Sequence, residues 1–258
     1  MSVYRDRPLT CPHCGHVTVE SVALTLDAKR AVAEVQAILD NTFQRFSCPA
    51  CEQVFRADGP LMFVDFDGQL WIGMFPESWE RDWWHHEQES ADAFQRNMVE
   101  NCPPIVREWA PGFTIRTVFG LPALREKLVA WQAGLDDVVV EAYKLVLLRD
   151  LGTFELSGQS RPRLIAVEDG HAVFDVPPQE PGKLNQISSA RIPLDELHDI
   201  VKRPKKWASV SESLSRGPYV DIGRIFIPRP ADDSAAADAE PAAGASVEGT
   251  APADPSEP

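Results

Sequence analysis

Four of the five cysteines form two similar pairs whose spacing is typical of a metal site. The first pair is Cys11-Pro12-His13-Cys14 and the second is Cys48-Pro49-Ala50-Cys51, with 33 residues between them. Each Cys-x-x-Cys turn directs two sulfurs toward one point, and two such turns supply the four thiolates that tetrahedral Zn²⁺ prefers. Four thiolates leave no open coordination position. We therefore expect the four cysteines to hold a structural zinc ion that ties two chain segments together.

Two other chemistries use the same residues. Spacing does not distinguish a four-cysteine iron site from a zinc site. Cys-Pro-His-Cys also resembles the redox pair of thioredoxin-like oxidoreductases, in which a low thiolate pKa makes the disulfide a strong oxidant. In those oxidoreductases the cysteine pair opens a helix after a buried strand. In this sequence a predicted strand follows the first pair, and a second pair is present. Structural zinc is favoured, and a thiol oxidoreductase is kept as an alternative.

Other side chains that could bind a metal have simpler interpretations. His13 and His16 lie beside the first pair, and with four cysteines present we expect both to be exposed or to support the ligands. His85-His86 follows a tryptophan-rich segment and lacks the His-Glu-x-x-His spacing of a zinc site. We therefore expect an aromatic-rich surface or interface turn there. Cys102 lies on an apolar helical face, so we expect a small buried hydrophobic side chain.

No pattern of a known catalytic site is present. The sequence has no glycine-rich phosphate loop and no Gly-x-Ser-x-Gly elbow. Asp65, Asp67 and Asp136-Asp137 are each explained as exposed strand, turn or cap residues. The basic stretch at residues 202–207 ends in a tryptophan and could contact RNA, but a solvated helix end is the simpler interpretation. We therefore expect a protein that is not an enzyme.

Charge and composition narrow the class of partner and the location. The net charge of −14 disfavours nucleic-acid binding, and no run of about 18 apolar residues is present for a membrane span. The first residues carry charges and no apolar signal segment, which predicts a cytoplasmic protein. Residues 231–258 contain seven acids, ten alanines and no lysine or arginine, so we predict a disordered acidic tail.

Strands and helices must hold the two cysteine pairs in place. After Cys14, alternating apolar residues predict a strand at residues 17–25, and Asp27 is suited to cap a helix at residues 28–39. After Cys51, residues 61–66 and 70–75 flank Asp67-Gly68, which predicts a β-hairpin with a two-residue turn.

Helical spacing and alternation divide the rest of the chain. Ser90 is expected to cap a helix whose apolar face carries Phe94, Met98 and Cys102. A strand at residues 113–119 follows, and then a helix pair or one kinked helix at residues 121–149. Beyond these, alternation predicts strands within 164–176, around Asp169-Gly170, and at 219–227, with a short helix at 194–202.

Several of these features together resemble the bacterial CpXC domain proteins over about residues 8–149. The resemblance rests on the two Cys-Pro-x-Cys pairs, Pro60-Leu61 with Asp65, and a set of later residues. That set is residues 116–119, Leu124, Glu126-Lys127 and Ala133-Gly134-Leu135-Asp136-Asp137. It implies an intracellular bacterial domain with a zinc-binding cysteine quartet and no established activity. Glu52, which follows Cys51, departs from the glycine common in zinc knuckles.

The sequence thus predicts an α+β protein. A zinc-ribbon-like unit with an inserted strand and helix packs on a helical segment, and together they form a CpXC-like domain at residues 8–149. A small β-rich domain at 152–228 and the acidic tail at 229–258 follow. The expected function is a non-enzymatic zinc-binding module that recognises another protein. A nucleic-acid-associated zinc ribbon is the main alternative.

Overall fold

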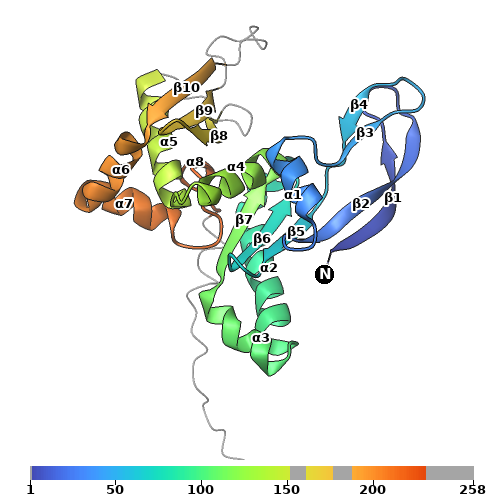
Figure 1. Ribbon diagram of the computed structural model, residues 1–258, viewed down its shortest axis with the longest axis horizontal. Coiled ribbons are helices and arrows are strands. Elements are labelled where there is room, and N and C mark those ends of the chain that lie inside the picture. The colour runs from blue at the N-terminus through green and yellow to red at the C-terminus, as the bar shows by residue number, and fades with distance from the viewer. Residues whose placement is uncertain (1, 152–160, 177–187, 231–258) are drawn as a thin grey trace, which may run out of the picture. The chain divides into compact units, whose positions relative to one another are not determined.

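A five-stranded mixed sheet organises the first half of the chain. The computed structural model describes residues 2–151, 161–176 and 188–230, and its architecture is mixed α+β (Figure 1). The strands of the sheet, in spatial order, are β1 (Val3–Thr10), β2 (Val17–Asp27), β5 (Leu61–Asp65), β6 (Leu70–Phe75) and β7 (Thr114–Phe119). The pairs β1/β2 and β5/β6 are antiparallel, whereas β2/β5 and β6/β7 are parallel.

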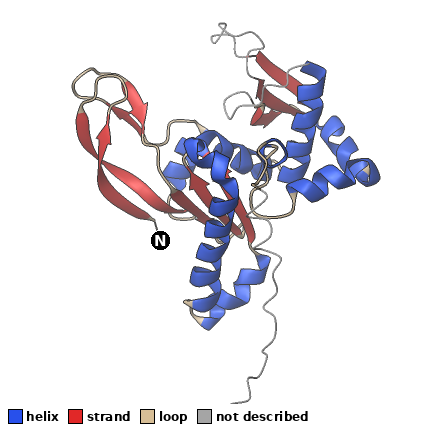
Figure 2. Ribbon diagram, turned by 180° about the vertical axis from the view of Figure 1, so that it is seen from behind, coloured by secondary structure: helices blue, strands red, loops and turns tan. Residues whose placement is uncertain are grey.

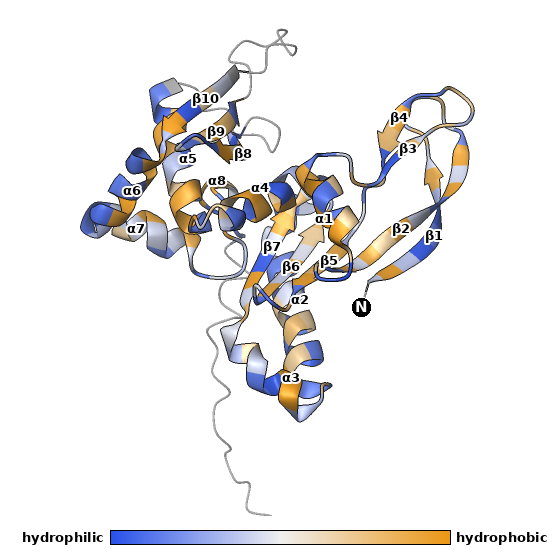
Figure 3. Ribbon diagram, in the orientation of Figure 1, coloured by the Kyte–Doolittle hydropathy of each residue, from blue (hydrophilic) through white to orange (hydrophobic). Residues whose placement is uncertain are grey.

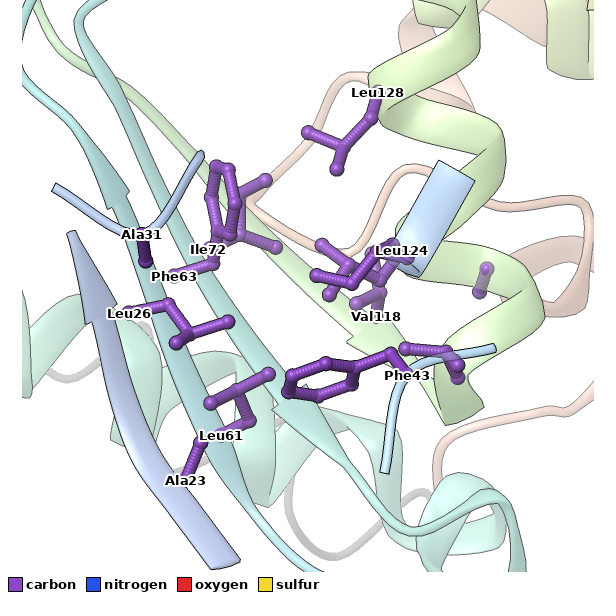
Figure 4. Packing of buried hydrophobic residues seen from close by; sticks show 13 residues of the cluster. Ala23, Leu26, Ala31, Phe43, Leu61, Phe63, Ile72, Val118, Leu124 and Leu128 are labelled. Atoms are coloured by element: carbon purple, nitrogen blue, oxygen red, sulfur yellow. The ribbon is translucent and has the colours of Figure 1, made fainter. Parts of the chain in front are cut away.

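One face of this sheet carries the first hydrophobic core. Helices α1 (Val32–Leu39) and α4 (Gly120–Gln132) contribute to this core and pack against each other. Leu26, Ile72 and Leu124 are completely buried between sheet and helix, as Figure 4 shows. Apolar side chains from β2, β5, β6 and β7 meet there, because every second residue of a strand faces the same side.

The opposite face carries a chain of short helical segments. These are η1 (Glu77–Asp82), α2 (Trp83–Phe94), the π-helical turn η2 (Gln95–Glu100), α3 (Pro104–Trp109) and η3 (Ala110–Gly112). Figure 2, the view from behind, shows α2 lying across the sheet. Helix α2 approaches β6 closely because Gly73 has no side chain: a Cβ there would lie 2.4 Å from the Oγ of Ser90.

The two cysteine pairs lie at the ends of hairpin strands. Strands β3 (Arg45–Ser47) and β4 (Val54–Arg56) form an antiparallel ribbon, and the second pair lies in the turn between them. The first pair lies between β1 and β2. A small separate core of Leu9, Phe46 and Phe55 joins the two hairpins next to Cys11 and Cys48.

The later part of the chain builds a three-stranded antiparallel sheet with helices. Its elements are α5 (Asp137–Leu151), β8 (Arg163–Glu168), β9 (His171–Val176), β10 (Ser188–Pro193), α6 (Leu194–Lys202), α7 (Pro204–Leu214) and the short α8 (Gly223–Phe226). The strand order is β10-β9-β8. Tyr143 of α5, Phe174 of β9 and Leu197 of α6 share one core.

Most predicted elements are confirmed. They include the first long strand, the hairpin of β5 and β6, the strand before residue 119, the helix pair α4 and α5, and the helix at 194–202. In the hairpin of β8 and β9, Asp169 and Gly170 have φ values of 49° and 74°. These positive values are what a tight two-residue hairpin turn requires. Figure 3 shows the hydrophobic residues that mark the central strands.

Two predicted helix starts are wrong. Asp27 ends β2 instead of capping a helix, because β2 continues to pair with β5 as far as Val64, and α1 begins only at Val32. Ser90 lies inside α2, which begins at Trp83, and it faces Gly73. The sequence does not predict helix α7, because the basic stretch indicates only the end of the preceding helix.

Two further details also differ. The turn between β5 and β6 has four residues, with positive φ at Gln69, because the Asp65 carboxylate accepts hydrogen bonds from the backbone N–H groups of Asp67 and Gly68, both at 3.0 Å. Residues 219–227 form no strand and end in α8. Their backbone bonds to a side chain and not to a neighbouring strand: the Val220 carbonyl accepts a hydrogen bond from the Lys127 Nζ at 2.6 Å.

The domain boundaries at residues 149–152 and 228–229 stay predictions. The segment 152–160 and most of the predicted tail, residues 231–258, lie outside the described residues. Within the described ranges, every helix is too short or too polar to cross a membrane.

Candidate metal centre

The two cysteine pairs have the same backbone geometry. In the first, the Cys11 N–H donates to the His16 carbonyl at 2.8 Å and the Gly15 N–H donates to the Cys11 carbonyl at 2.9 Å. In the second, the Cys48 N–H donates to the Gln53 carbonyl at 3.0 Å and the Glu52 N–H donates to the Cys48 carbonyl at 2.8 Å. The repeated pattern means that two equivalent knuckles face each other across the site.

Each knuckle needs a left-handed residue directly after its second cysteine. Gly15 has φ +75° and Glu52 has φ +60°. Glycine adopts this conformation freely, whereas a side chain there costs about 1 kcal/mol or somewhat more. Glu52 therefore completes the second knuckle in the same conformation as Gly15, but under local strain. The departure from glycine in the sequence has not changed the geometry.

The four sulfurs come together at the spacing of a tetrahedral site. The Sγ atoms of Cys11 and Cys51 are 3.8 Å apart, and those of Cys14 and Cys48 are 3.6 Å apart. All four sulfurs lie within 4.8 Å of one another. With Zn–S bonds of 2.3 Å, the edges of a sulfur tetrahedron are about 3.8 Å. The residues present therefore fit a metal ion such as zinc.

The electrostatics of the cluster also favour a cation. Burial would raise the pKa of Cys48, but backbone hydrogen bonds from Ala50 and Cys51 and the neighbouring thiols lower it to about 6. A backbone hydrogen bond from Gln53 lowers the pKa of Cys51, but burial and the three nearby sulfurs together outweigh it and raise this pKa to about 12. One thiolate forms easily and its neighbours then resist ionisation. A dication removes this conflict because it stabilises all four thiolates.

The ligand set combines an inner and an outer pair. Cys11 and Cys48 are buried against Phe55, whereas Cys14 is exposed and Cys51 is half-buried. His13 and His16 are exposed, as expected, and neither belongs to the four-sulfur group. A metal here would hold the tips of the β1/β2 and β3/β4 hairpins together, with two sulfurs facing their shared core.

A second group of charged residues is buried under helices α4 and α5. Cations and carboxylates alternate along one continuous chain of ion pairs. Its members in order are Arg116, Asp137, Lys127, Glu141, Lys144, Glu126, Arg163, Asp221, Arg161 and Glu80. The five positive and five negative groups balance. The chain joins η1, β7, α4 and α5 to β8 and to the segment before α8.

Three carboxylates in this chain are close enough to hold a metal. Oxygens of Glu126, Glu141 and Asp221 lie within 4.8 Å of one another. The ammonium group of Lys144 forms ion pairs with Glu126 at 2.7 Å and with Glu141 at 2.8 Å, and Arg163 lies 2.9 Å from Asp221. These lysine and arginine charges compensate the carboxylates, so the group is explained without a metal.

The sequence interpretation missed most of this chain. Asp137 was expected at an exposed helix cap, but it is 2% exposed and pairs with Arg116 at 2.7 Å and Lys127 at 3.0 Å. Burial alone would raise the pKa of Asp137, but the Lys127 and Arg116 charges hold it well below its usual range. Asp136 is the capping residue, because its carboxylate accepts the Val138 N–H. The sequence signal that could have indicated this chain of ion pairs is a lysine and a glutamate at buried positions of an apolar helix.

The remaining candidates are placed as follows. His86 stacks between Phe75 and Trp79, with ring centroids 4.6 and 5.1 Å apart, and its Nδ1 lies 3.2 Å from Glu89. Trp79 of η1 is 42% exposed, but His85 and His86 lie in helix α2 and not in the predicted turn. Cys102 is half-buried, not fully buried, and its thiol donates to the Met98 carbonyl at 3.0 Å.

The basic stretch forms the end of α6 and the start of α7. Arg203 pairs with Asp199 at 3.1 Å, and the Lys206 Nζ lies 5.5 Å from the centre of the Trp207 ring. Residues 202–206 are exposed, which agrees with a solvated helix end, and Asp199 neutralises part of their positive charge.

Comparison with known protein families gives a match over half of the chain. A family model described as CpXC protein matches residues 9–144. No curated protein and no solved structure matches the chain significantly. The matched region begins just before Cys11, contains all four cysteines, and ends at Lys144 in the buried charge chain.

Proposed function

Because the chain belongs to the CpXC protein family, we propose that Cys11, Cys14, Cys48 and Cys51 bind one zinc ion in a structural site. The observation that carries the proposal is the convergence of two equivalent knuckles, with sulfur distances of 3.6 and 3.8 Å. Zinc fits this set because four thiolates in a tetrahedron satisfy it completely. Its role is to fasten the β3/β4 ribbon to β1/β2 as a zinc-ribbon-like unit.

The unit fastened in this way serves to bind another protein and does not catalyse a reaction. A four-thiolate zinc site has no open position for a substrate. Close to the knuckles, Val17 and Val19 of β2 and Val54 of β4 are 54%, 67% and 53% exposed. Exposed apolar side chains on a rigid support are typical of protein contact surfaces. The partner surface therefore includes these valines, and zinc keeps them in a fixed arrangement.

Metal analysis tests the zinc part of the proposal. Plasma mass spectrometry of the purified wild-type protein should find one zinc per chain, and native thiol titration should find only Cys102 reactive. The Cys48→Ser variant should lose the metal. Cys102→Ser is the matched control, because Cys102 lies outside the cluster and its loss should leave zinc content unchanged. A metal-free wild type with reactive thiols would contradict structural zinc and favour the oxidoreductase alternative.

Crosslinking in the source cells tests the partner part. A photoreactive amino acid at position 19 should crosslink to another protein, whereas the same group at Val201, which is 60% exposed on α6, should not. The crosslink at position 19 should disappear when Cys48→Ser is added. Crosslinks to RNA or DNA at position 19 would instead favour the nucleic-acid alternative, against which the net charge of −14 argues. An absence of any crosslink at positions 17, 19 and 54 would contradict the interaction surface.

A further inference from the structure

The helical layer behind the main sheet covers the sheet unevenly. Helix α2 packs on β6 and β7, where Gly73 allows its close approach. The chain then passes through the π-helical turn η2 into α3, and no residue of α3 is buried. The α2 side of β2 and β5 consequently has less helical cover than the α1 side, where Leu26 and Phe63 are at most 1% exposed.

A cavity lies at this thinly covered part of the sheet. Its volume is about 450 Å³, within the range of small-molecule sites. Met62 and Val64 of β5 and Trp71 of β6 come from the sheet side. Met98 of η2 and Val106 of α3 come from the helical side. Two thioethers and an indole make a soft, polarisable lining that suits flat or branched apolar groups.

One polar group in this lining lacks a partner. Trp71 is 6% exposed, and its Nε1 is buried with no hydrogen-bond partner among the described residues. A buried indole N–H without an acceptor costs about 1–3 kcal/mol, so such groups are usually bonded. The neighbouring Phe94 ring packs against the indole at 5.5 Å but offers no acceptor. The Nε1 is closed to solvent whereas the cavity is open to it, so Trp71 offers its apolar ring, and not its N–H, to a bound molecule.

The charges around the cavity restrict the ligand further. Asp27 is the charged residue among the described lining residues, and its carboxylate already lies 3.7 Å from the Arg30 Nε. Asn97 and Asn101 add neutral amides near the helical wall, and the Asn97 Nδ2 donates to the Ala93 carbonyl at 2.7 Å. This lining offers no unpaired charge to a ligand, so a charged molecule would lose its hydration without compensation.

We propose that this cavity binds a small, uncharged, mainly apolar molecule. The ligand contacts the two methionines, Val106 and the Trp71 ring. The cavity shares no residue with the cysteine site, so the proposal stands independently of zinc binding and of the protein partner.

A fluorescent probe tests the proposal on the full-length, zinc-replete protein. Prodan is uncharged, carries a ketone oxygen on a naphthalene ring, and shifts its emission to the blue in apolar surroundings. We expect saturable binding of one prodan per chain. Val106→Trp should weaken binding at least tenfold because the larger ring fills the cavity. Ile105→Trp is the matched control: Ile105 neighbours Val106 on α3, is 59% exposed and does not line the cavity, so affinity should stay within twofold.

A second probe tests the class of ligand. N-phenyl-1-naphthylamine is also uncharged and apolar but has no carbonyl oxygen. It should bind the wild type saturably, and Val106→Trp should weaken its binding as it weakens that of prodan. Non-saturable prodan binding, or wild-type affinity in Val106→Trp, would overturn the site.

Alkylation of Cys102 provides a test that needs no variant. Cys102 lines the cavity and is half-buried. Saturating prodan should slow the reaction of its thiol with N-ethylmaleimide at least threefold, measured by peptide mass mapping. An unchanged rate with prodan bound would place the probe elsewhere and contradict the proposal.

Discussion

The buried charge chain makes Lys144 the most sensitive test position in the fold. Its side chain is completely buried, and its Nζ lies 2.7 Å from Glu126 and 2.8 Å from Glu141. The substitution Lys144→Met keeps a long unbranched side chain and removes the charge. Two buried carboxylates then share one cation fewer, and five negative groups face four positive ones.

The expected loss of stability is about 3–5 kcal/mol, the cost of removing one partner from a buried ion pair. The lower end is favoured, because Glu126 keeps Arg163 at 2.9 Å and the Leu164 N–H at 2.7 Å. A domain of this size has a total stability of about 5–15 kcal/mol. The variant should therefore fold, but with a clearly lower denaturation midpoint.

The loss should depend on pH with a defined sign. Burial raises the pKa of Glu141 above its usual value of 4.5, and the Lys144 charge opposes this rise. In Lys144→Met the pKa therefore rises further. Between the unfolded pKa and the raised folded pKa, the folded state binds an extra proton, so lower pH favours folding at this residue. The difference in stability between variant and wild type should therefore become smaller as the pH is lowered from 7.5 to 5.5.

Urea denaturation followed by circular dichroism measures both effects. The matched control is Lys29→Met, because Lys29 pairs with Asp67 at a similar distance of 3.0 Å but the two side chains are 67% and 68% exposed. The control should change stability by less than about 1 kcal/mol. A loss below about 1 kcal/mol for Lys144→Met, or a loss that does not change with pH, would refute the account of the buried chain.

Three further predictions concern the knuckles and the sheet. Glu52→Gly should raise the free energy of unfolding by about 0.5–1 kcal/mol, because it relieves the left-handed conformation at φ +60°; a lower urea midpoint would contradict this strain. Zinc uptake by metal-free protein at pH 7.5 should release the protons of Cys14 and Cys51, because the pKa values of both thiols are raised. Calorimetry in buffers of different ionisation enthalpy should detect the released protons, and binding without proton release would contradict the predicted protonation. Gly73→Ala should destabilise the protein by about 1–3 kcal/mol, because the new Cβ would lie 2.4 Å from the Ser90 Oγ. Adding Ser90→Ala to this variant should recover part of the loss, and equal melting temperatures for all variants would contradict the close contact.

The cysteine site was predictable because its signal is local. Two Cys-Pro-x-Cys motifs define their own turns, and backbone hydrogen bonds such as that from Cys48 to Gln53 span only a few residues. The β8/β9 hairpin was predictable for the same reason, since Asp169-Gly170 suits the positive φ angles of its turn. Local sequence also predicted the α4 and α5 pair, whose apolar residues recur at helical spacing.

The buried charge chain was not predictable because its partners are distant in sequence. Arg161 meets Glu80 across 81 residues, and Lys127 reaches the Val220 carbonyl across 93. A single sequence does not indicate which lysine pairs with which glutamate. The end of β2 was misjudged for a related reason: pairing with β5 extends the strand to Asp27, against the local preference of aspartate for a helix start.

X-ray absorption at the zinc edge of the purified protein tests the central claim most directly. We predict a first shell of four sulfurs at about 2.3 Å with no nitrogen or oxygen ligand. Cys102→Ser should leave this spectrum unchanged, because Cys102 lies outside the four-sulfur group. A shell containing nitrogen or oxygen, or a protein that holds no zinc, would contradict a closed structural site formed by Cys11, Cys14, Cys48 and Cys51.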